Sequence, residues 1–95
     1  MLLSKLRIVG HSMEPILKNN NLVLISNIFY IFKHPQINDI VAFRFDDKIF
    51  VKRITKSKNQ KYFLEGDNKS DSLDSRGFGW ISRNEILGKY FYKLT

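Results

Sequence analysis

Six short runs of β-branched and aromatic residues are spread along the chain, separated by clusters of Asn, Asp, Gly and Pro. Runs of this kind favour strands, and the polar clusters between them favour turns. The expected strands are residues 6–9, 22–25, 39–45, 49–54, 61–65 and 86–94. We therefore expect an all-β, mostly antiparallel fold, built as a small barrel or a pair of sheets, with at most a short helical turn after Pro15.

The size and composition of the chain fit one compact unit. It has 95 residues, of which 43% are hydrophobic and 26% charged, and it shows no internal repeat and no Pro/Gly/Ser linker. Residues 1–95 are therefore expected to form a single domain. Within it, "FRFDDKIF" (43–50) predicts a hairpin with Asp46 and Asp47 at its tip.

Several kinds of chemistry are excluded by residues that the sequence lacks. There is no cysteine, which rules out disulfides and thiolate chemistry. His11 and His34 lie far apart without metal-ligand spacing, and no glycine-rich phosphate loop occurs. We therefore expect no metal and no cofactor.

No apolar run reaches the roughly 20 residues that a membrane-spanning helix needs, and the first residues lack a signal-peptide pattern.

The formal net charge of +7 points to anionic partners, and much of the excess lies in residues 48–61. No nucleic-acid-binding motif accompanies this charge, so a nucleic acid is not expected and an anionic membrane surface is the candidate partner. The apolar stretch Leu22–Phe32 is interpreted as strand plus loop. It predicts either a packed core segment or an exposed aromatic edge at Phe29, Tyr30 and Phe32 that is suited to a membrane surface.

Two residues far apart in the sequence form a candidate catalytic pair. Ser12 in "GHSMEP" could simply stabilise a turn through its hydroxyl. Lys52 in "IFVKRI" shares a strand face with Phe50 and Ile54, because side chains alternate across a strand. Apolar neighbours would desolvate this lysine, lower its pKa and leave a neutral amine able to take a proton from a serine. The alternative is a lysine whose amino group reaches solvent.

A polar loop, "GDNKSDSLDSRGFG" (66–79), follows the fifth expected strand. Its short polar side chains can bond their own backbone and hold the loop in one shape. Asp74 and Arg76 stand two residues apart and can add a charge-assisted pair.

Taken together, "GHSMEPIL", "INDIVAF", "FVKRI" and this loop resemble the type I signal peptidases, the S26 family of serine peptidases that use a serine–lysine dyad. The resemblance runs from about Val9 to Lys89. It implies that Ser12 is the nucleophile, with Met13 as the methionine that follows it. It also implies that Lys52 is the general base, with Arg53 as the arginine beside it.

The same resemblance implies supporting roles. Ser72 matches the serine that helps orient the lysine, and Asp74 and Arg76 match an ion pair that supports the active-site region. Gly10 stands where some family members carry a serine whose hydroxyl helps bind the oxyanion. The backbone amide of Ser12 is therefore expected to be the main donor to that oxyanion.

Three departures from the family pattern bear on the fold and the location. Asn19–Asn21 replaces a Gly-Asp turn, and Asn38 replaces a glycine. Asparagine tolerates a positive φ better than most residues, so both turns are expected to form. The usual N-terminal membrane anchor and most of the extra domain of the larger bacterial enzymes have no counterpart here.

The function implied by the resemblance is a serine endopeptidase that cleaves signal peptides or similar N-terminal extensions after small residues. Its peptide substrate would bind as an extended strand, and the enzyme would act peripherally at the extracytoplasmic face of a membrane. One alternative is a soluble, cytoplasmic maturation peptidase of the nickel superoxide dismutase type. A self-cleaving repressor is disfavoured, because only eleven residues precede Ser12. The last alternative is a basic nucleic-acid- or lipid-binding module without catalysis. The sequence indicates no oligomeric state.

Overall fold

The computed structural model describes residues 3–70 and 79–95, and within them the fold is all-β, as predicted. The strands are β1 (Ser4–Arg7), β2 (Leu22–Ser26), β3 (Ile40–Phe45), β4 (Lys48–Lys58), β5 (Lys61–Glu65), β6 (Ile81–Ser82) and β7 (Ile86–Lys93). Two single-turn 3-10 helices, η1 (Ile28–Tyr30) and η2 (Arg83–Glu85), complete the described elements. No helix in the described part of the chain is long and apolar enough to cross a membrane.

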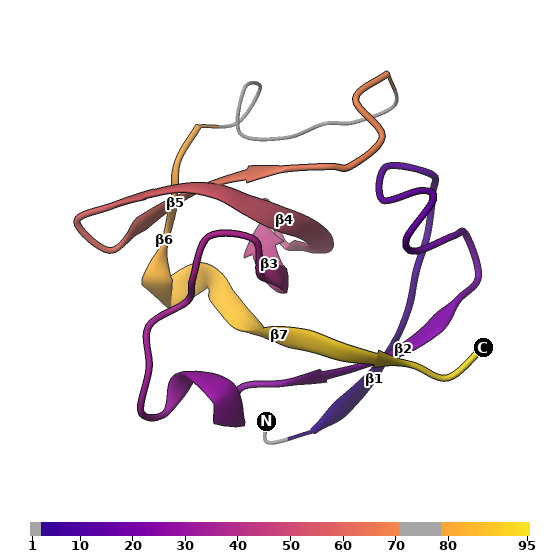
Figure 1. The fold of residues 1–95 in the computed structure, drawn as a ribbon, viewed down its shortest axis with the longest axis horizontal. Coiled ribbons are helices and arrows are strands. Elements are labelled where there is room, and N and C mark those ends of the chain that lie inside the picture. The colour runs from indigo at the N-terminus through magenta and orange to yellow at the C-terminus, as the bar shows by residue number, and fades with distance from the viewer. Residues whose placement is uncertain (1–2, 71–78) are drawn as a thin grey trace.

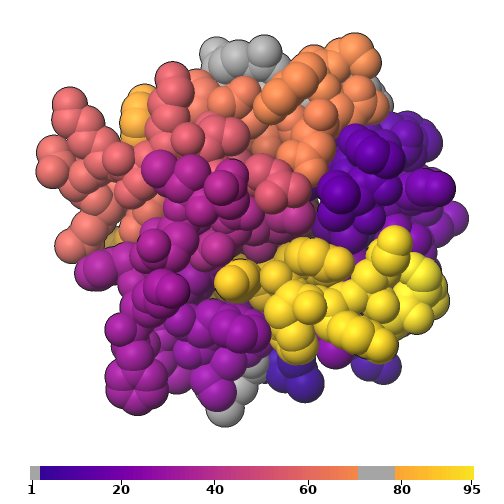
Figure 2. Space-filling view, in the orientation of Figure 1, coloured from indigo at the N-terminus to yellow at the C-terminus, as the bar shows by residue number. Residues whose placement is uncertain are grey.

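The strands form one antiparallel sheet in the order β1-β2-β7-β3-β4-β5-β6. In Figure 1, β4 and β5 run along one side of the molecule, β7 and β2 along the other, and β3 lies between them. Figure 2 shows the N-terminal region, in indigo, packed between the residues after β5, in orange, and the C-terminal strand, in yellow. Segments from both ends of the sequence are therefore in contact in the folded molecule.

The buried apolar side chains form two clusters, and the central strand β3 contributes to both. Val41 and Phe43 belong to the cluster that contains Ile54, whereas Ile40 and Ala42 belong to the cluster around Met13 and Leu17. Since alternate residues of a strand face opposite sides, β3 is covered on both faces. This explains why its sequence is a continuous apolar run rather than an alternating one.

The predicted turns form where they were expected. Asp46 and Asp47 connect β3 to β4 with φ of 52° and 61°, so the predicted hairpin tip is confirmed. Asn20 and Asn38 adopt φ of 73° and 81°. Asparagine thus accommodates the left-handed backbone at both positions where the resemblance leads us to expect glycine.

Two details of the sequence prediction are wrong. The first strand lies at Ser4–Arg7 rather than 6–9, and the two-residue strand β6 was not predicted, because a strand of that length has no period of its own. The expectation of at most a short helical turn near Pro15 agrees with the structure. The Leu17 amide donates to the Met13 carbonyl at 2.9 Å and closes a single turn that contains Pro15, and two 3-10 turns lie at η1 and η2.

The aromatic run after β2 is split between core and surface. Tyr30 is only 8% exposed and belongs to the core cluster, whereas Phe32 is 96% exposed and Phe29 is partly exposed. The prediction of an exposed aromatic edge is therefore wrong for Tyr30 and right for the two phenylalanines. Tyr30 is the last residue of the 3-10 turn η1 and packs into the core, while Phe29 and Phe32 stay at the surface.

Candidate functional site

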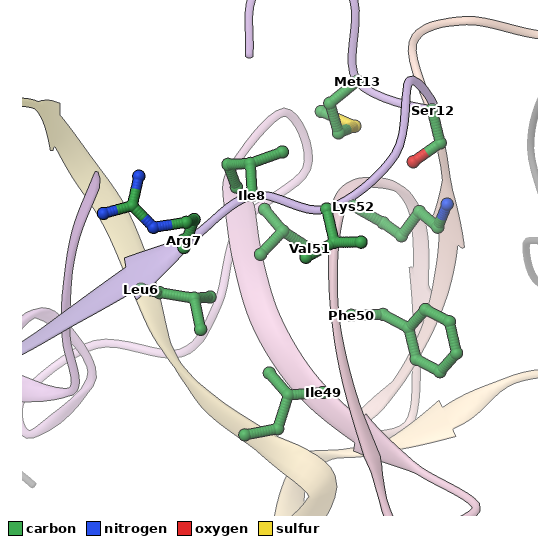
Figure 3. A pocket seen from close by; sticks show the side chains of 10 residues that line it. Leu6, Arg7, Ile8, Ser12, Met13, Ile49, Phe50, Val51 and Lys52 are labelled. Carbon is green, nitrogen blue, oxygen red and sulfur yellow. The ribbon is translucent and has the colours of Figure 1, made fainter. Parts of the chain in front are cut away.

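A small pocket lies between the chain around the end of β1 and the first half of β4 (Figure 3). Its cavity volume is about 90 Å³. The lining residues are Leu6, Arg7, Ile8, Val9, Ser12, Met13, Ile49, Phe50, Val51 and Lys52. Sites for drug-sized ligands usually measure roughly 300–1,000 Å³. This pocket therefore suits a small side chain rather than a free organic cofactor.

Lys52 is the buried basic residue of this pocket, at 3% exposure. In the β3–β4 register it lies opposite the fully buried Val41. Ile54, two residues further along β4, is fully buried, and Phe50 packs against the same core cluster. Strand alternation therefore places Lys52 on the apolar face, as the sequence predicts. Figure 3 shows its side chain extending to the end of the pocket at which the Ser12 hydroxyl lies.

Ser12 stands on a tight turn that local contacts hold in place. Gly10 has φ of 91°, a conformation that favours glycine, and its amide donates to Asn19 Oδ1 at 2.8 Å. The Glu14 amide donates to the His11 carbonyl at 3.2 Å. Met13 is buried in the second core cluster and anchors the turn there. These contacts hold the turn, and the turn places Ser12 beside the pocket.

Arg53 projects from β4 away from Lys52 and forms an ion pair that the sequence pattern did not indicate. Its Nε and Nη2 atoms donate to the two carboxylate oxygens of Asp67, each at 2.9 Å, and Nη1 donates to the Asn38 carbonyl at 3.0 Å. The hydrogen bond to Asp67 raises the pKa of Arg53, although burial acts in the opposite direction. Asp67 thereby ties the start of the polar loop to the strand that carries Lys52.

Three of the predicted supporting residues, Ser72, Asp74 and Arg76, lie outside the described residues. The other three predicted supporting residues are described. Met13 lines the pocket, and Gly10 and Arg53 are sequence neighbours of the lining residues Val9 and Lys52. Across residues 3–70 and 79–95, no group of three or more His, Asp or Glu side chains is arranged to hold a metal ion.

Sequence comparison finds one family model and several curated relatives that match the chain. The model described as Peptidase S24-like matches residues 3–91. A probable signal peptidase I-2 from Synechocystis sp. is 24% identical over 132 aligned residues, covering 92% of this chain and 61% of the relative. A signal peptidase I from Buchnera aphidicola subsp. Baizongia pistaciae is 31% identical over 93 residues, covering 86% of this chain and 28% of the relative.

The chain therefore spans less than two thirds of the length of these relatives. A second signal peptidase I, from Buchnera aphidicola subsp. Schizaphis graminum, is 38% identical over 53 residues, which is 56% of this chain and 17% of the relative. These names support the predicted kinship at a coarser level, that of a peptidase of the S24/S26 kind. Because the family model covers nearly the whole chain, the protein belongs to the Peptidase S24-like family.

Proposed function

We propose that the protein is a serine endopeptidase in which Ser12 is the nucleophile and Lys52 the general base. The observation that carries this proposal is a lysine at 3% exposure lining the same small pocket as a serine on a tight turn. Lysines are almost never fully buried unless they are paired, and here the pairing that this proposal invokes is with Ser12. The membership of the chain in a peptidase family gives the pair its chemical context.

Burial is what makes Lys52 suitable as a base. Removing the amino group from water disfavours the charged ammonium form and so lowers the pKa of a lysine. The positive charge of the adjacent Arg53 is offset by the Asp67 carboxylate, so the proposal does not depend on repulsion from Arg53. A neutral amine is then available at the working pH.

The reaction proceeds in two halves. The neutral Lys52 amine takes the Ser12 hydroxyl proton while Oγ forms a bond to the scissile carbonyl carbon. The Ser12 amide donates to the oxyanion of this tetrahedral intermediate. The carbon–nitrogen bond then breaks and the Lys52 ammonium gives its proton to the leaving amine. Water next attacks the acyl-enzyme with Lys52 again taking the proton, which releases the acid and returns the proton to Ser12.

The substrate in this proposal is an extended peptide with a small side chain at the cleavage point. Residues Ile49–Lys52 of β4 pair with β3 on one side. On the other side, among the described strands, β5 pairs with β4 only from Arg53 onward, so this side of Ile49–Lys52 borders the pocket. An extended peptide can lie along such a segment by strand addition. The small volume of the pocket, about 90 Å³, favours a small side chain in it. Signal peptides and similar N-terminal extensions fit this description.

A membrane surface is the proposed location, and it rests on charge and on one apolar patch. The net charge is +7, and Ile28, Phe29, Ile31 and Phe32 are exposed in and just after η1. We call these four residues the η1 patch. Apolar side chains combined with positive charge favour the interface of an anionic bilayer.

The test is cleavage of a panel of preprotein peptides by the purified protein, followed by mass spectrometry of the products. Ser12→Ala and Lys52→Ala should each remove cleavage and leave the circular dichroism spectrum of a β protein unchanged. Cuts should fall after small residues. Cleavage by Ser12→Ala at the wild-type rate would contradict the proposal.

The same panel separates the alternative functions. A maturation peptidase would cut the N-terminal extension of one partner and leave signal peptides intact. A basic binding module would cut nothing and would instead bind nucleic acid or anionic lipid with an affinity that falls as salt is added.

A further inference from the structure

The loop that follows β5 contacts the backbone of the Ser12 turn at two neighbouring carbonyl groups. The Asn68 amide donates to the Ser12 carbonyl at 2.8 Å, and the Asn68 side-chain Nδ2 donates to the His11 carbonyl at 3.0 Å. Asn68 and His11 lie 57 positions apart in the sequence. Figure 2 shows the corresponding orange and indigo regions in contact on the surface.

The orientation of the Asn68 side chain is set by its partners. The His11 carbonyl can only accept, so the amide must direct its NH2 group toward it. Ser70 Oγ donates to Asn68 Oδ1 at 3.0 Å on the other side of the amide. Both ends of the side chain are therefore bonded, and its donor points at the turn.

The His11 carbonyl and the Ser12 amide belong to one planar peptide unit. The cis bond of the described chain is Glu14–Pro15, so the His11–Ser12 unit is trans, with its C=O and N–H pointing in opposite directions. A donor that fixes the carbonyl on one side therefore fixes the direction of the N–H on the other. It also polarises that N–H, because hydrogen bonds in a chain strengthen one another.

We propose that Asn68 is a positioning residue that aims the Ser12 amide at the developing oxyanion. This inference rests on the proposed function, in which that amide is the oxyanion donor. The loop that carries Asn68 is itself held by the bidentate contact between Asp67 and Arg53. Since Arg53 is the neighbour of Lys52 on β4, one polar chain fixes the nucleophile turn relative to the strand of the base.

The test replaces only the donor. Asn68→Asp keeps the size of the side chain and the backbone bond to Ser12, but it removes the NH2 group; Asn68→Ala removes it without adding a charge. Each should lower kcat about tenfold or more, in line with the cost of a weakened oxyanion donor, and leave KM unchanged. The matched control is Lys69→Ala in the same loop, whose amino group contacts Glu65 at 3.1 Å and not the turn; it should behave as wild type.

An inhibitor comparison separates positioning from a merely structural role. A substrate-like peptide aldehyde forms a hemiacetal with the serine, and its oxygen occupies the position of the oxyanion. Its affinity should fall in parallel with kcat in both Asn68 variants, while the affinity of an uncleaved product peptide should not change. Wild-type kcat in Asn68→Asp and Asn68→Ala would overturn the inference, as would an equal loss of affinity for aldehyde and product peptide. Activity retained by Ser12→Ala would instead overturn the proposed function itself.

Discussion

Lys52 is the residue whose chemistry decides between a catalytic and a structural interpretation of the pocket. Taking the Lys52 amino group out of water beside Val41 and Ile54 disfavours its charged form. If the site existed only for stability, an apolar residue in this position would serve the core better. In the proposed function, the amine is retained because it transfers protons.

We expect Lys52→Arg to lower kcat/KM by about 10²–10⁴-fold, the usual contribution of a general base. Guanidinium remains protonated and cannot accept the Ser12 proton. In the wild type, activity should rise with pH as the lysine loses its proton. The measurement is a pH profile of kcat/KM for the wild type and for His11→Gln.

The pH profile also tests whether the nearby imidazole takes part. His11 Nδ1 lies 2.6 Å from Glu14 Oε2 on the exposed side of the turn, so its side chain is occupied away from the pocket. The rising limb should persist in His11→Gln. Loss of that limb in this variant, or full activity in Lys52→Arg, would contradict the role given to Lys52.

At the scale of single residues, the sequence predicts orientation better than it predicts partners. Strand period places Lys52 on the apolar face and Arg53 on the opposite one, because alternation is a local property. The Arg53–Asp67 pair could not be predicted in the same way. It depends on where the loop after β5 crosses β4, and that is decided by the β4–β5 register with its irregularity between Ile54 and Lys56.

At the scale of elements, η1 is held to the start of β3 by a buried phenol. Tyr30 Oη donates to Asp39 Oδ2 at 2.6 Å, and the Gln36 amide donates to the same oxygen at 3.1 Å. Lys89 of β7 lies 3.5 Å from the other carboxylate oxygen. One carboxylate thus joins a helical turn, a loop and two neighbouring strands.

The pKa of Tyr30 is raised well above its ordinary value of 10.0, first by burial and then by the hydrogen bond to Asp39. A group whose pKa is raised on folding stabilises the native state fully below its unfolded pKa. This contribution is lost as pH rises above about 10, where the unfolded phenol ionises first.

We therefore expect Tyr30→Phe to lower the free energy of unfolding by about 1–2 kcal/mol at pH 7, because the hydrogen bond to Asp39 is lost. The difference between wild type and variant should shrink as pH rises above 10. Urea unfolding at pH 7 and at a pH just above 10 measures both values. A difference that grows between the two pH values would contradict the assignment.

The strand positions were largely predictable from the sequence, whereas their order was not. The expected runs at 22–25, 39–45 and 61–65 coincide with β2, β3 and β5 to within a residue. The insertion of β7 between β2 and β3 depends on contacts between distant parts of the chain. Local composition gives strand propensity but carries no information on such pairings.

At the scale of the whole molecule, positive charge and exposed apolar surface meet at the η1 patch. The Phe29 ring lies 5.3 Å from the Phe91 ring, and Lys89 Nζ lies 5.2 Å from the centre of the Phe29 ring. Lys89, which also contacts Asp39, therefore lies beside several exposed apolar side chains. Such an arrangement can insert rings at the level of lipid headgroups while the cation contacts phosphate.

We expect the protein to sediment with vesicles that contain anionic lipid, and the bound fraction to fall as salt is added, because salt screens the attraction. Phe32→Asp should weaken this binding, since it removes the most exposed ring of the η1 patch. Leu94→Asp is the matched control: it adds the same charge at a partly exposed apolar residue near the C-terminus, which Figure 1 shows at the other end of the molecule from the helical turn after β2. Equal losses in the two variants would show that net charge alone drives binding. Salt-resistant partitioning into a detergent phase would contradict a peripheral contact altogether.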